Sequence, residues 1–150
     1  MITSILVPVD GSAHALAAVE LASDLAQKYD ARLTLVHVMT ELGSGRVPDE
    51  LRDLARLEHV DLTDSDLLKG VATRILDDAE RKAREKGFRR TETVLEAGDP
   101  GQRIVDLAKE RKADLIVMGR RGLGDLRGLL LGSVSHKVAQ LAGCACLTVK

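Results

Sequence analysis

The residues best suited to chemistry form a glycine-rich stretch near the C-terminal end of the chain. Glycine allows a positive φ and lets backbone N–H groups approach an anion closely. Ser133 and Ser135 follow at once and open an amphipathic segment, and a helix that begins there favours negative charge at its N-terminus. We therefore predict a phosphate-binding loop, the alternative being a flexible turn in which Ser133 only caps its helix. The five glycines of the stretch are Gly119, Gly122, Gly124, Gly128 and Gly132.

Two well-known phosphate loops do not match this stretch. A P-loop requires Gly-Lys followed by Ser or Thr, and no glycine of the chain has that sequence after it. The dinucleotide-binding fingerprint requires a third glycine, but the run that starts with Gly122 and Gly124 reaches Arg127 at that position. The loop is therefore of another type.

The elements that must position this loop alternate between strand and helix. Apolar, β-branched runs predict strands over residues 2–9, 32–39, 91–97, 114–118 and 145–150. Helices are predicted from the cap Ser12 to about Tyr29, over 64–86, and from the cap Asp99 with Pro100 in its first position. Such alternation indicates parallel strands with helices on both faces. Ligands bind such open sheets at the carboxyl ends of the strands, here after residue 9 or from Gly119 onward.

The connection over residues 40–62 is longer than a plain loop needs to be. It contains a Gly-Ser-Gly patch and a possible short helix over 49–58. Long connections often carry function, so we interpret this one as a possible lid or partner surface.

The glycine spacing also resembles a family motif. Gly119-x2-Gly122-x9-Gly132-Ser133 is similar to the ATP-binding pattern of the universal stress protein family, G-2x-G-9x-G-S/T. The resemblance continues in VPVDGS at 7–12, VHV at 36–38, VMG at 117–119 and GSVS at 132–135. Because these motifs extend along the chain, the whole of residues 1–150 is identified as one such domain.

The resemblance implies a fold and a function. It implies an open five-stranded parallel sheet of order 3-2-1-4-5, of the Rossmann-like, adenine nucleotide alpha hydrolase-like type. It further implies a stress-response regulator that binds ATP with Mg²⁺ or Mn²⁺ and acts through dimerisation or a protein partner. The implied nucleotide-binding residues are Pro8, Val9, Asp10, Gly11, Ser12, Val38, Met118, Gly119, Arg121, Gly122, Gly132, Ser133, Val134 and Ser135.

Charge gives two of these residues an independent chemical role. Asp10 can accept a hydrogen bond from a ribose hydroxyl or from a water on a bound metal, and Arg121 can neutralise phosphate. The sequence leaves the choice for Asp10 open. It also offers no placed general base and no catalytic triad, so we expect at most weak ATPase activity.

Composition excludes several other classes of protein. The net charge is −1, and Tyr29 and Phe88 are the only aromatic residues, which argues against a nucleic-acid binder. No apolar stretch reaches the length of a membrane helix and no leader pattern opens the chain, so we expect a cytoplasmic protein. Leu, Val, Ile and Ala must build the core.

The remaining polar residues have structural interpretations. Cys144 and Cys146 are expected to be buried free thiols rather than a redox pair, and His37 is expected to be a strand residue whose ring is satisfied by the protein. In many relatives the last strand pairs across a two-fold axis, so we expect a homodimer through residues 145–150. Two alternatives stay open: a dimeric interaction module of the same fold without a nucleotide, and a slow ATP hydrolase.

Overall fold

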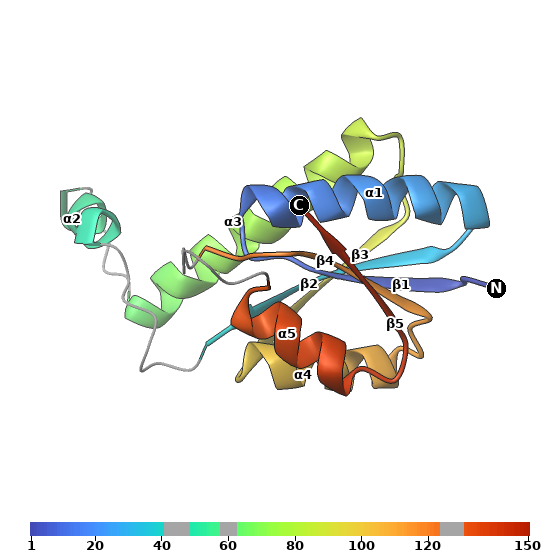
Figure 1. Ribbon diagram of the computed structural model, residues 1–150. Helices are drawn as coiled ribbons and strands as arrows, with labels where there is room; N and C mark the ends of the chain where they lie inside the picture. Colours follow the sequence, from blue (N-terminus) through green and yellow to red (C-terminus); the bar gives the residue numbers. More distant parts are fainter. Residues whose placement is uncertain (41–48, 58–62, 124–130) are drawn as a thin grey trace.

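A computed structural model describes residues 1–40, 49–57, 63–123 and 131–150. Within these residues five parallel strands form one sheet in the order β3-β2-β1-β4-β5, which confirms the predicted topology (Figure 1). The strands are β1 (Ser4–Pro8), β2 (Arg32–Met39), β3 (Thr91–Ala97), β4 (Leu115–Gly119) and β5 (Ala145–Val149). Each lies within two residues of its predicted bounds.

Helices cover both faces of the sheet. They are α1 (Ala13–Tyr29), α2 (Asp49–Leu57), α3 (Asp64–Glu85), α4 (Pro100–Glu110) and α5 (Ser133–Leu141). Figure 1 shows α1 and α3 on one face and α4 and α5 on the other, with α2 apart from the sheet. The short helix predicted at 49–58 is thus confirmed as α2, while most of the remaining 40–62 connection lies outside the described residues.

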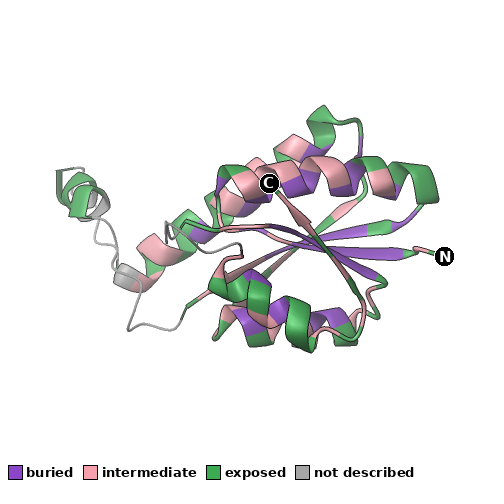
Figure 2. Ribbon diagram, in the orientation of Figure 1, coloured by how far each residue is buried: buried purple, intermediate pink, exposed green. Residues whose placement is uncertain are grey.

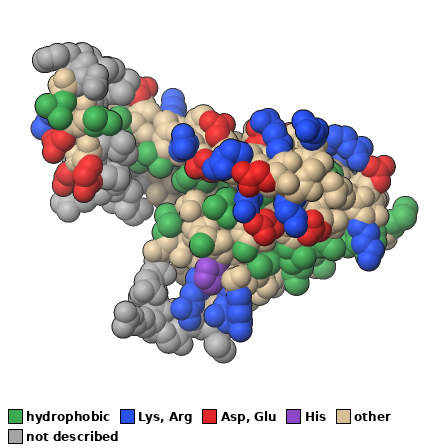
Figure 3. All heavy atoms as spheres, turned by 90° about the horizontal axis from the view of Figure 1, so that it is seen from above, with side chains coloured by type: hydrophobic (Ala, Val, Ile, Leu, Met, Phe, Trp, Pro, Cys, Tyr) green, Lys and Arg blue, Asp and Glu red, His purple; other side chains and the backbone are tan. Residues whose placement is uncertain are grey.

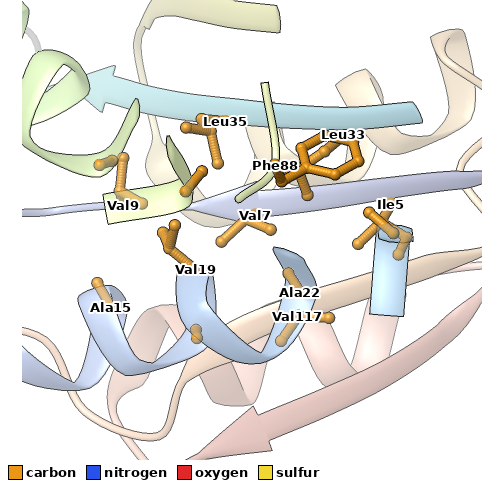
Figure 4. Packing of buried hydrophobic residues seen from close by; sticks show 14 of the residues in the cluster. Ile5, Val7, Val9, Ala15, Val19, Ala22, Leu33, Leu35, Phe88 and Val117 are labelled. Atoms are coloured by element: carbon orange, nitrogen blue, oxygen red, sulfur yellow. The ribbon is translucent and has the colours of Figure 1, made fainter. Parts of the chain in front are cut away.

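The core consists of aliphatic side chains on both faces of the sheet. On the α1 and α3 face, Ile5, Val7 and Leu35 are fully buried (Figure 4). Burial is concentrated along the sheet and on the helix surfaces that face it (Figure 2). Phe88 is only 3% exposed and belongs to this cluster, whereas Tyr29 is exposed at the end of α1. The prediction of an aliphatic core is confirmed.

Side chains cap the helices where the sequence predicts. The Ser12 hydroxyl accepts from the Ala15 N–H at 3.2 Å, and the Asp99 carboxylate accepts from the Gln102 N–H at 2.8 Å. Each cap satisfies a backbone N–H group that the first helical turn leaves without a partner. The structure adds a capping box at the start of α3, where Thr63 and Asp66 bind each other's backbone N–H groups.

The outer surface of α3 carries intermixed charges. Arg81 lies 2.9 Å from Asp78 and 3.1 Å from Glu85, and Lys82 lies 2.5 Å from Glu20 on α1. Figure 3 shows basic and acidic side chains side by side on this face of the molecule. Most Lys and Arg side chains between residues 81 and 90 are paired with acids in this way, which is typical of the solvated end of a helix.

The two central strands separate at their carboxyl ends. β1 pairs with β2 as far as Pro8↔Val36, and β4 pairs with β5 as far as Gly119↔Val149. The register between β1 and β4, in contrast, covers only Ile5↔Leu115 and Leu6↔Ile116. Space therefore opens between β1 and β4, at the point where the strand order reverses.

At the opposite end, Asp114 ties these two strands together. Its Oδ2 accepts from the Thr3 N–H at 2.7 Å, the Thr3 hydroxyl at 2.9 Å and the Ser4 N–H at 3.1 Å. The hydrogen bonds from Thr3 hold the pKa of the Asp114 carboxyl below its ordinary value. A lowered pKa stabilises the fold above the ordinary carboxyl pKa, and this contribution is lost as the pH falls through the lowered value.

We expect Asp114→Asn to be less stable than the wild type at neutral pH, because the ionised carboxylate makes stronger hydrogen bonds than an amide oxygen. The difference should shrink as the pH falls below about 4, where the free carboxyl of the unfolded chain becomes protonated. Urea unfolding followed by circular dichroism, from neutral to acid pH, measures this difference. A gap that stays constant down to the acid end would contradict the assignment.

Candidate functional site

A single cavity brings most of the predicted site residues together. It has a volume of about 470 Å³ and lies at the carboxyl ends of the strands, where β1 and β4 separate. That volume is within the usual range for small-molecule sites. The predicted residues that line it are Pro8, Val9, Asp10, Val38, Met118, Gly119, Arg121, Gly122, Gly132, Ser133, Val134 and Ser135.

Two predicted site residues do not line the cavity. Gly11 has a φ of +83°, which glycine adopts without strain, and a Cβ there would lie 3.3 Å from Ile75 of α3. Ser12 is buried, and its hydroxyl caps α1. Both residues therefore shape the turn after β1 without forming the cavity wall.

Asp10 connects the turn after β1 with the loop after β4. Its Oδ1 accepts from the Ser12 N–H at 2.9 Å, and its Oδ2 accepts from the Leu123 N–H at 3.2 Å. The carboxylate is thus held by backbone on both sides of the β1–β4 opening. Each oxygen keeps lone-pair capacity for a further donor at the cavity wall.

Two of the motif glycines, Gly119 and Gly122, are required for close approach rather than for unusual backbone angles, whereas a Cβ at Gly132 would meet its nearest atom at an ordinary 3.5 Å. Among the described glycines, positive φ occurs at residues 11, 87 and 98, so the prediction of positive φ is wrong for Gly119, Gly122 and Gly132. A Cβ at Gly119 would lie 2.9 Å from the backbone of α1, and one at Gly122 would overlap Asp10 Oδ2. Gly124 and Gly128 lie outside the described residues.

The N-terminus of α5 faces the cavity without a side-chain cap. Gly132 is the N-cap residue and makes no side-chain hydrogen bond, so Ser133 does not cap this helix. The Ser135 hydroxyl donates to the Gly119 carbonyl at 2.8 Å, which fastens α5 to the end of β4. Half-buried Arg121 lines the same end of the cavity. First-turn amides and a guanidinium group make this end suitable for an anion.

The opposite part of the cavity is apolar, and most of its residues are not among the site residues predicted from the sequence. Leu68, Val71 and Ile75 are spaced along one side of α3 and line this part. Val71 and Ile75 fall at helical spacing, which is typical of residues that pack on a sheet, but Val71 is exposed and Ile75 is half-buried. The other cavity residues that were missed are Ala15, Val36, His37, Met39, Thr40, Pro100, Ile104, Leu123 and Leu131.

His37 has a protein partner for its ring as predicted, and the two cysteines are free as predicted but half-buried rather than buried. His37 is half-buried and its Nδ1 lies 2.7 Å from the Val9 carbonyl oxygen, which confirms a protein partner for its ring. Cys144 and Cys146 are free thiols, and burial raises the pKa of both. A raised thiol pKa lowers the thiolate fraction and with it the reactivity.

Two further features are absent from the described residues. No three His, Cys, Asp or Glu side chains in this part of the chain come together as a metal site. None of its helices has both the length and the apolar character to cross a membrane.

The fold and the cavity together define an α/β protein with a ligand site at the switch point of a parallel sheet. The model of the universal stress protein family matches residues 1–150, and the chain belongs to this family. The universal stress protein YxiE of Bacillus subtilis is 37% identical over 158 residues that cover 100% of both chains.

Solved structures of the family have the same fold. Universal stress protein UspA from Lactobacillus plantarum has a TM-score of 0.78 and 27% identity, with 99% of this chain and 98% of that chain covered. A universal stress protein solved in complex with cAMP has a TM-score of 0.72 and 31% identity, with 99% and 97% covered.

Proposed function

We propose that this universal stress protein binds ATP in the cavity between β1 and β4 and acts as a nucleotide-dependent regulator of the stress response. The observation that carries the proposal is the uncapped N-terminus of α5, which faces a cavity that is apolar at its other end. An adenine nucleotide has the same polarity, with an apolar base at one end and anionic phosphates at the other. The cAMP bound by the relative of 31% identity is also an adenine nucleotide.

The two ends of the cavity suggest how the nucleotide lies. The adenine base packs among aliphatic side chains such as Val9, Val38 and Met118, because neither Tyr29 nor Phe88 lines the cavity. The ribose lies near Asp10, whose carboxylate accepts from a sugar hydroxyl. The phosphates lie against Arg121 and the first amides of α5 at residues 133–135, where oriented backbone dipoles favour anions.

A divalent cation enters this proposal with the nucleotide. The described residues form no three-ligand cluster, and both oxygens of Asp10 already accept backbone N–H groups. Mg²⁺ keeps several waters and is commonly bound through substrate phosphates. We therefore propose that the phosphates carry Mg²⁺ or Mn²⁺, and that Asp10 contacts the ion at most through a water molecule.

A second copy of the chain is the proposed first partner. β5 is the outer strand of the sheet and pairs with β4 on one side. Leu147 is 37% exposed and Thr148 is half-buried on this strand, which leaves an edge that can add another strand. Pairing of residues 145–150 across a two-fold axis would make the homodimer.

Calorimetric titration of the purified protein with ATP in the presence of Mg²⁺ tests the proposal. We expect saturable binding by the wild type and at least a tenfold loss in Gly122→Arg, because the added side chain enters the space beside Asp10. Gly143→Arg is the charge-matched control, since nothing lies within 4 Å of a Cβ at that position.

The same samples can be used to measure ATP hydrolysis and the oligomeric state of the protein. Chromatography of the nucleotide after incubation with Mg²⁺ or Mn²⁺ shows whether the γ-phosphate survives, and analytical ultracentrifugation gives the oligomeric state. Absence of measurable affinity for ATP, ADP and AMP in the wild type would overturn the binding proposal and favour the interaction module without a nucleotide.

A further inference from the structure

One polar ring lies in the apolar end of the cavity. Val9, Val71 and Ile75 line this end from the end of β1 and from α3, and His37 lies among them at the carboxyl end of β2. Among the described residues, the polar side chains that line the cavity also include Thr40, which is exposed just beyond β2. His37 therefore supplies the half-buried polar contact that a ligand in this part of the cavity would meet.

A backbone hydrogen bond determines the tautomer of His37. Its Nδ1 lies 2.7 Å from the Val9 carbonyl oxygen, and a carbonyl oxygen can only accept. Nδ1 therefore carries the proton, and Nε2 of the neutral ring is an acceptor. Val9 is itself held by its N–H, which donates to the Val36 carbonyl at 2.8 Å, so the ring is anchored on both sides to the strand ends.

The acceptor atom Nε2 of His37 is accessible. In the described part of the chain, buried side-chain nitrogens that lack a hydrogen-bond partner occur at residues such as His14 and Arg120. His37 Nε2 is not one of them, although no hydrogen bond to it is formed by the described residues. The atom is therefore accessible, and it belongs to a residue that lines the cavity.

We infer that His37 determines base specificity by accepting a hydrogen bond from an amino group of the bound base. The inference rests on the adenine nucleotide proposed above, whose exocyclic amino group is such a donor. A 6-oxopurine carries an oxygen at the same position. Because this oxygen and Nε2 are both acceptors, they would face each other without a hydrogen bond. The cavity then selects 6-aminopurines over 6-oxopurines, because an unpaired polar group in a buried site is costly.

Comparison of ATP with ITP tests the inference, because ITP carries oxygen in place of the 6-amino group. We expect the wild type to bind ATP at least tenfold more tightly than ITP in calorimetric titrations with Mg²⁺. His37→Phe keeps a planar ring and removes the acceptor, so the ratio of the two Kd values should fall by about tenfold. The ratio is the decisive quantity, because a general disturbance of the cavity weakens both ligands alike.

Two further variants make the test specific. His37→Gln retains an amide that can donate to Val9 and accept from the base, so we expect it to keep most of the preference for ATP. Val71→Ala removes part of the apolar wall, and it should weaken ATP and ITP together and leave their ratio unchanged.

The outcomes separate this inference from the proposed function. A wild type that binds ATP and ITP equally, or a His37→Phe variant that keeps the wild-type ratio, overturns the role of His37 while ATP binding stands. A wild type without affinity for any adenine nucleotide overturns the proposed function itself. If His37→Phe fails to fold by circular dichroism, His37→Leu, which also lacks an acceptor, takes its place in the comparison of ATP with ITP.

Discussion

Gly119→Ala is expected to lower the free energy of unfolding by about 2–3 kcal/mol, near the upper end for overpacking of a well-packed site. A Cβ at residue 119 would lie 2.9 Å from the backbone nitrogen of Ala15 and 2.9 Å from the backbone carbon of His14. Both atoms belong to the first turn of α1, so no side-chain rotation relieves the contact. Either α1 or the end of β4 must shift. Urea unfolding followed by circular dichroism measures the loss.

Gly143→Ala provides the matched control for this prediction. No atom lies within 4 Å of a Cβ at residue 143, and the change of residue type is identical. Its stability should differ from the wild type by less than about 0.5 kcal/mol. Equal stability of the two variants would show that β4 does not approach α1 as closely as described.

Gly122→Ala is expected to reduce affinity for ATP at least tenfold while leaving the unfolding free energy nearly unchanged. A Cβ at this exposed position would overlap Asp10 Oδ2, which accepts the Leu123 N–H at 3.2 Å. The Asp10 carboxylate must move away from residue 122, and the hydrogen bond that it accepts from the Leu123 N–H in the loop after β4 is then lost. Since that loop forms one wall of the cavity, the proposed ribose and phosphate contacts are displaced with it.

A double-mutant cycle with Asp10→Ala isolates the cause of that loss. If the overlap with the carboxylate is responsible, Gly122→Ala should change affinity by less than about threefold in the Asp10→Ala background. Calorimetric titration of the four proteins with ATP gives the coupling. An undiminished effect of Gly122→Ala in that background would mean that the glycine acts through another contact.

Local patterns were sufficient to predict most of the secondary structure. The strand at 32–39 and the strand at 91–97 match β2 and β3 to the residue, because β-branched and apolar residues end there at turn formers. The caps Ser12 and Asp99 were also predictable from local sequence, because capping depends on the residue type and on a neighbour three positions later.

Features that depend on how distant segments of the chain pack together could not be predicted from local patterns. The role of Gly122 depends on where the Asp10 carboxylate lies, 112 positions earlier in the chain. Likewise, helical periodicity shows which residues of α3 are apolar but not which of them pack on the core and which line the cavity. Leu76 packs on the core, whereas Val71 lines the cavity. Hydrophobicity is the same for both uses, so the pattern alone does not distinguish them.

The isolated position of Tyr29, exposed at the end of α1, has a practical consequence for spectroscopy. The chain has no tryptophan and no other tyrosine, so its own absorbance near 280 nm is very weak. Any adenine that accompanies the purified protein would therefore dominate the ultraviolet spectrum with a maximum near 260 nm. A plain absorbance scan, taken before and after denaturation and filtration, reads out nucleotide occupancy without a label. Tyrosine fluorescence, in turn, should be insensitive to the ligand, because Tyr29 is not among the residues that line the cavity.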